Sequence, residues 1–285
     1  MYFLQNFFIF LRKLCIRILL REYPNKLLKS SSKSSSKAYK CINLISSTDN
    51  FWVSESMFRK WNFYSNFRKI ELNIYSNKDV NSFMKDNFNN DLIYEIYQKS
   101  ILPVQKIDLF RICWIYLNGG IWLDLKSEIN IKKVLKIYKK HESLGMLLWE
   151  PRKIDVISSS GKQQTRLHKN VIHNGFFALP KGSKFLEELL FKIRKDYLYF
   201  QDVVFSSPKQ GIMNLTGPHQ FTRTFFNLEK NKRPYLVSQE EIDWIFYSKY
   251  GEFISPFKRV KHYSTLSQLK TINSSKKSYL EEDCI

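Results

Sequence analysis

Apolar and polar positions follow two different rhythms along the middle of the chain. Compact apolar runs predict strands, and apolar residues that recur every three or four positions predict helices. The predicted strands cover residues 40–46, 70–75, 121–123, 144–149 and 171–178. The predicted helices cover residues 51–67, 80–88, 91–99, 184–197 and a segment that begins near Pro103. Elements that alternate in this way indicate an α/β domain.

Residues 106–128 carry the most informative local pattern. Asp108 and Arg111 stand three positions apart in a predicted helix, which places them on one helical face. Gly119 and Gly120 end this helix, because glycine adopts backbone angles that other residues resist. A short apolar strand then ends at Asp124, and the carboxyl end of a buried strand is where open α/β sheets bind ligands. The alternative is a core helix with an Asp108–Arg111 ion pair, followed by an acid that caps the next element.

This ordered set resembles the sugar-nucleotide-binding core of glycosyltransferase family 32, which includes fungal initiating mannosyltransferases and bacterial capsular polysaccharide enzymes. The resemblance runs from about Cys41 to about His262 and is strongest in residues 106–126. It implies a GT-A fold, a Rossmann-like mixed sheet flanked by helices. It also implies a UDP- or GDP-sugar donor, a glycan, glycolipid or glycoprotein acceptor, transfer with retention, and usually a Mn²⁺ or Mg²⁺ ion.

The resemblance also implies roles for individual residues. Asp124 would contact the metal or the ribose and diphosphate of the donor. Asp108 and Arg111 would support the nucleotide or the donor sugar. Gly119 and Gly120 would let the donor approach the backbone closely.

One position departs from the family pattern, because Lys126 stands where an Asp-x-Asp motif would place its second acid. Residues two apart in a strand point to the same side, and an ammonium cannot bind a metal ion. Asp124 could therefore bind the metal with help from Glu128 or His262. Alternatively, Lys126 itself offsets the charge of the departing diphosphate, or it is an ordinary solvated lysine.

Two segments beyond this region bear on the site. Residues 152–170 are polar and without periodicity, and we expect them to form a mobile loop beside the site. His173 and Asn174 could hydrogen-bond sugar hydroxyls, since an amide has both donors and an acceptor. Equally, Asn174 and Gly175 could form a bulge or turn.

The segment from Thr216 to His219 resembles a Thr-Gly-Pro segment that opens a helix near the active-site cleft in the family. Thr216 is expected to cap that helix at its amino end. His219 could face the cleft, although a single histidine is more often structural than catalytic.

The first twenty residues combine an apolar helical face with Arg12, Lys13 and Arg17 on the other side. This pattern predicts a basic helix on the cytoplasmic face of an anionic membrane. The alternatives are a signal anchor in the Golgi of a eukaryote or an ordinary packing helix. The predicted organisation is a membrane-associating helix (1–29), a Ser/Lys linker (30–37), the GT-A domain (38–270) and a flexible tail (271–285).

Composition limits the remaining possibilities. The chain is 44% hydrophobic and 16% aromatic, which excludes wholesale disorder, and its four cysteines lack metal-ligand spacing. A net charge of +20 favours anionic partners, but no nucleic-acid-binding motif accompanies it, and we expect no nucleic-acid partner. The hypotheses are a glycosyltransferase, a catalytically impaired homologue that binds glycans or membranes, and a basic nucleic-acid-binding protein.

Overall fold

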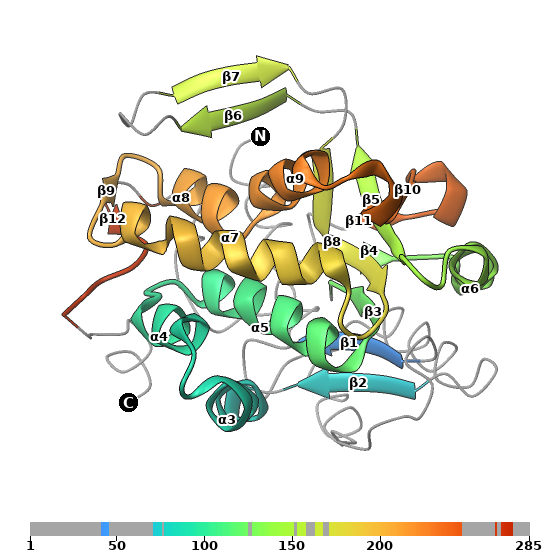
Figure 1. The fold of residues 1–285 in the computed structure, drawn as a ribbon, viewed down its shortest axis with the longest axis horizontal. Helices are drawn as coiled ribbons and strands as arrows, with labels where there is room; N and C mark the ends of the chain where they lie inside the picture. The colour runs from blue at the N-terminus through green and yellow to red at the C-terminus, as the bar shows by residue number, and fades with distance from the viewer. Residues whose placement is uncertain are drawn as a thin grey trace, which may run out of the picture.

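The computed structural model describes residues 41–45, 71–75, 77–124, 127–150, 153–157, 163–167, 171–246, 266 and 269–275. Within these residues the central feature is a six-stranded sheet (Figure 1). Its strands, in spatial order, are β10 (Tyr235–Val237), β5 (Met146–Glu150), β8 (Val171–Leu179), β3 (Gly120–Leu123), β1 (Cys41–Ile45) and β2 (Glu71–Tyr75). Strand β8 runs antiparallel to both of its neighbours, and the other pairs are parallel. The predicted mixed α/β sheet is therefore confirmed.

Most of the described helices cover one face of this sheet, where α5 and α7 lie side by side (Figure 1). They are α3 (Asn77–Phe88), α4 (Leu92–Lys99), α5 (Pro103–Asn118), α7 (Lys184–Phe200), α8 (Pro208–Leu215) and α9 (Pro218–Asn227). The main core lies between this layer and the sheet and includes Trp122 and Phe177. Among the described residues, no helix has both the length and the apolar composition needed to cross a bilayer.

The other face of the sheet is covered by α6 (Ile131–Lys140) and the short helix η3 (Glu240–Ile242). Ile121 and Leu123 pack here, whereas Trp122 between them packs into the main core. Successive side chains of a strand point to opposite faces, so β3 needs apolar residues at every position. This two-sided burial holds the end of β3 in a fixed position.

The five predicted strands are all present, with bounds shifted by two residues at most. Pro103 begins α5 as expected. The predicted helix at 51–67 and the predicted segments 1–29 and 30–37 lie outside the described residues.

The expectation of an irregular loop at 152–170 was wrong. Strand β6 (Lys153–Ile157) pairs antiparallel with β7 (Gln163–Leu167) to form a hairpin between β5 and β8. Strand β7 has a single apolar residue among five, so apolar periodicity does not predict it.

The segment near the carboxyl end also packs differently from the tail that was expected from residue 271. Thr271 and Ile272 are fully buried. Ile272 forms bridges with Ser100 and Gln201, after α4 and α7 respectively. The folded part of the chain thus reaches beyond the predicted boundary at residue 270.

Candidate functional site at the ends of β3 and β8

The site lies at one edge of the central sheet. Strands β1, β2 and β3 are parallel, so their carboxyl ends meet at the same edge. The chain passes from β1 to β2 on one side and returns to β3 on the other side of β1. Ligands of open α/β sheets bind where strand order reverses in this way. Asp124 follows the last residue of β3 at this point.

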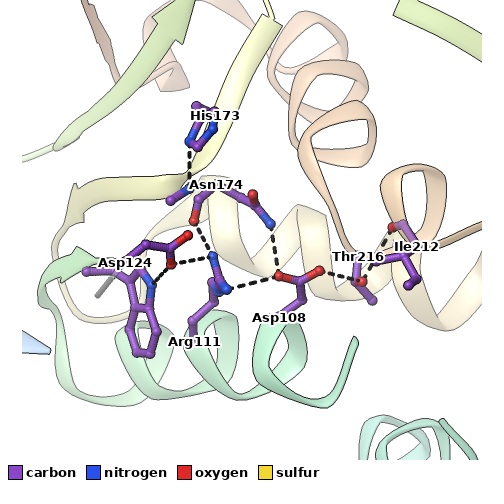
Figure 2. Close-up of polar contacts among 9 residues, drawn as sticks. Asp108, Arg111, Asp124, His173, Asn174, Ile212 and Thr216 are labelled. Carbon is purple, nitrogen blue, oxygen red and sulfur yellow. Dashed lines mark hydrogen bonds and ion pairs between the residues drawn. The ribbon is translucent and has the colours of Figure 1, made fainter. Parts of the chain in front are cut away.

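Arg111 of α5 joins three parts of the chain at this edge. Its Nη1 lies 3.0 Å from Asp124 Oδ1 and donates a 2.7 Å hydrogen bond to the carbonyl oxygen of Asn174. Its Nη2 lies 3.2 Å from Asp108 Oδ1, one helical turn earlier. Figure 2 shows the guanidinium between the two carboxylates. The Arg111 side chain is only 6% exposed, so these contacts fix it in place.

Asp108 is the buried end of this network. Asn174 Nδ2 donates to its Oδ1 at 3.0 Å, and Thr216 Oγ1 donates to its Oδ2 at 3.1 Å (Figure 2). The pKa of the Asp108 carboxyl is raised to about 7, chiefly by burial and also by the nearby Asp124, although Arg111 and both hydrogen bonds oppose the rise. Because Asp108 is buried, its role is to hold Arg111 and Asn174 in place and not to contact a ligand from solvent.

A bulge in β8 forms the opposite wall. Leu147 of β5 is opposite Phe177, but the next residue, Leu148, is opposite His173, so residues 174–176 are left unpaired with β5. On the other side, the carbonyl oxygen of Gly175 accepts a 2.7 Å hydrogen bond from the Asp124 backbone N–H. The alternative of a bulge at Asn174 and Gly175 is therefore what the backbone shows.

Asp124 is the accessible member of the network. Its side chain is 27% exposed, and Oδ1 accepts a 3.1 Å hydrogen bond from Trp122 Nε1 in addition to its contact with Arg111. Its other oxygen, Oδ2, faces Gly175, where an added Cβ would lie 2.9 Å away. Within the described part of the chain, both side-chain donors to Asp124 bind Oδ1, which leaves Oδ2 directed to the bulge.

The His173 ring lies near this carboxylate, on the other side of Gly175, and Trp244 packs against it. His173 Nδ1 accepts a 3.0 Å hydrogen bond from the Gly175 N–H, so the proton of the neutral ring lies on Nε2. The ring of Trp244 lies 5.0 Å from that of His173. The contact between Trp244 and His173 was not predicted, because no local pattern connects residues 71 positions apart in the sequence. The hydrogen bond from Trp122 was not predicted either, because a tryptophan inside an apolar run indicates a core residue.

Only some of the predicted site residues meet at the end of β3. It brings together Asp108, Arg111, Asp124 and Asn174. The Asn174 amide donates to Asp108 and is buried, so it supports the network, and its contact with a sugar stays a prediction. The two glycines lie at the start of β3, at the opposite end from Asp124. There Gly119, with φ of 71°, ends α5.

Other expectations are corrected or lie outside the described residues. Thr216 does not cap the helix that follows it: it ends α8, and Gly217 occupies the N-cap position of α9. The reason is tertiary, since the Thr216 hydroxyl is engaged by Asp108. His219 is buried in the first turn of α9. Lys126 and His262 are not among the described residues.

No cluster of three or more histidine, cysteine or acidic residues suited to a metal ion occurs among the residues described. Glu128 lies in β4 (Ser127–Glu128), which pairs with β11 (Ile245–Phe246). Asp124 Oδ2 is one oxygen ligand, and Mn²⁺ or Mg²⁺ needs about six. These residues alone do not fit a metal ion.

Comparison with known proteins adds a partial match to one family model. Residues 13–144 match the family model described as a glycosyltransferase sugar-binding region containing a DXD motif, which is somewhat less than half of the 285-residue chain. No curated protein matches the chain. Among solved structures, one titled PaToxG glycosyltransferase is 14% identical, with a TM-score of 0.41; the match covers 76% of this chain and 84% of that one. The matched region contains α5, β3 and Asp124, so the part of the chain that carries the site is similar to that sugar-binding region.

Proposed function

We propose that this protein is a glycosyltransferase that moves a hexose from a UDP- or GDP-sugar to a glycan, glycolipid or glycoprotein acceptor. The observation that carries the proposal is Asp124. Its carboxylate stands at the strand-order reversal, is fixed through Oδ1 by Arg111 and Trp122, and keeps Oδ2 toward the β8 bulge. The family match to residues 13–144 supports it.

The fixed residues have a clear role in donor binding. An acceptor-only oxygen such as Asp124 Oδ2 suits a ribose or sugar hydroxyl, which has a proton to donate. Because Arg111 holds Asp124 in one orientation, the donor is bound without reorganising the carboxylate, which favours precise positioning of its anomeric carbon.

Charge on the departing nucleoside diphosphate must also be offset. A Mn²⁺ or Mg²⁺ ion would supply this stabilisation as a Lewis acid, and it would need ligands such as His262 in addition to Asp124. Lys126 would supply it as a fixed ammonium instead. Transfer with retention remains part of the proposal, supported by the resemblance to family 32.

The second candidate is a catalytically impaired homologue that binds glycans or membranes. The observation that favours it is Lys126, which replaces the second acid of the DXD pattern. Either function is compatible with peripheral association on the cytoplasmic face of a membrane, which we propose from the basic amphipathic pattern of residues 1–29.

The test is release of nucleoside diphosphate by the purified full chain from a panel of UDP- and GDP-sugars, with manganese or with EDTA. We expect one donor to be hydrolysed and Asp124→Asn to lower the rate at least about a hundredfold, as the loss of one fixed electrostatic group does. Asp86→Asn, on the exposed surface of α3, is the matched control.

The outcomes separate the candidates. Equal turnover in EDTA would assign the neutralising charge to Lys126. Donor binding without turnover would favour the impaired homologue. If the chain neither turns over nor is thermally stabilised by any donor, the transferase proposal fails.

A further inference from the structure

Exposed apolar side chains cluster at the carboxyl end of α7. Leu198 is 73% exposed and Tyr199 is 70% exposed, and in the turn that follows Val203 is 39% and Val204 is 56% exposed. Single exposed apolar residues are ordinary, but a cluster on a surface marks an interaction site. We name these four residues the apolar tip.

The residues beneath the apolar tip are well packed, so its exposed side chains are not the result of an incompletely folded core. Tyr197 and Phe205 fill the inward positions, and the ring of Phe205 stacks on Phe200 at 5.8 Å. Strand β9 (Val204–Phe205) pairs with β12 (Leu269–Lys270). Figure 1 shows β9 and β12 beside the end of α7, at the left of the view. The fold thus holds Leu198, Tyr199 and Val204 outward.

Three lysines lie near the apolar tip in the sequence or in the β9–β12 pair. Lys195 is exposed and lies one helical turn before Leu198 and Tyr199, so it shares their face. Lys209 is exposed at the start of α8. Lys270 lies opposite Val204 in the β9–β12 pair and forms a 3.1 Å ion pair with Asp202. Asp202 offsets only one of these charges, so the surroundings are positive, as is the whole chain at +20.

We propose that the apolar tip is a membrane-docking surface, which enters the boundary between headgroups and acyl chains of an anionic bilayer. Tyrosine and aliphatic side chains favour that boundary, and lysines beside them favour anionic headgroups. A protein partner fits less well, because four residues on a helix end fall far short of the roughly 800 Å² that each partner contributes to a stable interface. The apolar tip is a different part of the sequence from residues 1–29, and the proposal does not depend on the transferase proposal.

The test is flotation of the full chain with vesicles of phosphatidylcholine alone or of phosphatidylcholine in which about one lipid in three is phosphatidylserine. This share of anionic lipid is enough to attract a basic surface. We expect Leu198→Ser combined with Tyr199→Ser to weaken binding to the anionic vesicles at least about tenfold, because two apolar side chains no longer leave water. Ile245→Ser is the control, since Ile245 is 48% exposed on β11, away from the apolar tip.

Further measurements make each outcome decisive. Thermal unfolding checks that the double variant stays folded. Lys195→Glu should weaken binding to the anionic vesicles and leave the neutral ones unaffected. Unchanged binding by the double variant overturns the proposal. Light scattering that shows a dimer of the wild type but not of the double variant also overturns it, in favour of docking between two copies.

Discussion

At the residue scale, Arg111 decides the geometry of the site. It contacts both Asp108 and Asp124 and a backbone carbonyl of β8, all within a buried environment. The sequence predicted the Asp108–Arg111 pair on one helix face, and that pair is confirmed. It did not show that the same guanidinium would orient Asp124, because residues 111 and 124 belong to different elements and meet only when α5 packs on β3.

The buried Asp108 makes stability depend on pH. Its pKa in the folded protein, about 7, lies above the ordinary value of 3.8. Protonated Asp108 therefore contributes stability that is fully present below about pH 4 and is lost as the pH rises through 7. We expect the free energy of unfolding of the wild type to fall over this range relative to Asp108→Asn, by at most about 1.4 kcal/mol per pH unit. Denaturant unfolding of both proteins from pH 4.5 to 7.5 measures this.

Parallel stability curves for these two proteins would contradict the expected role of Asp108. Asp86→Asn on α3 serves as the control for removal of a surface carboxylate. An acid stabilised mainly by its ion pair with Arg111 would have a lowered pKa, so it would give no slope over this range and would lose stability only below about pH 4.

At the scale of elements, the bulge of β8 creates the space beside Asp124. The dipeptide Asn174-Gly175 indicated either a bulge or a sugar contact, and the backbone forms the bulge. Asp108 accepts a hydrogen bond from the Asn174 side chain, and Arg111 donates one to the Asn174 carbonyl oxygen, so both contacts stabilise this conformation. Gly175 is needed there, since a Cβ would lie 2.7 Å from the His173 ring and 2.9 Å from Asp124 Oδ2.

Gly175→Ala should therefore impair activity more than stability. The atoms that the new methyl group meets are ends of side chains and not backbone, so the fold can accommodate the methyl group, but it would push Asp124 out of the position on which donor binding depends. We expect at least about a tenfold loss in kcat/KM, as misplacement of binding groups causes, with a change in the free energy of unfolding below about 1 kcal/mol. Steady-state kinetics and denaturant unfolding test both parts.

The matched control is Gly211→Ala, which adds the same methyl group in α8 against Thr271 and Phe205. We expect it to keep its kcat/KM. If Gly175→Ala kept full activity, Asp124 Oδ2 would not be the group that contacts the donor.

At the scale of the whole molecule, the end of the described chain ties two helices together. The backbone N–H groups of Ile101 and Asp202 donate to the carbonyl oxygens of Thr271 and Ile272, respectively. Ile272 belongs to the main core with residues of α4 and α7. The predicted tail thus contains residues that stabilise the domain, at least as far as Ile272.

We expect Ile272→Ala to lower the free energy of unfolding by about 2–4 kcal/mol, because a fully buried side chain leaves a cavity. Ser275→Ala, at an exposed position, should change it by less than about 0.5 kcal/mol. Chemical unfolding of the full-length proteins measures both. A small effect of Ile272→Ala would mean that residues from 271 onward behave as the flexible tail that the sequence suggested.

The sequence by itself determined the local features: the five strands, the start of α5 at Pro103, the shared face of Asp108 and Arg111, and an acid directly after β3. Each of these features depends on the spacing of residues within one element. Apolar periodicity and the backbone preferences of glycine and proline are therefore enough to predict it. Only the tertiary structure decided which distant residues meet. Asn174 and Thr216 bind Asp108 across 66 and 108 positions of sequence. The physical reason is that such contacts arise from the packing of α5, α8 and β8 around one another, which no single segment encodes.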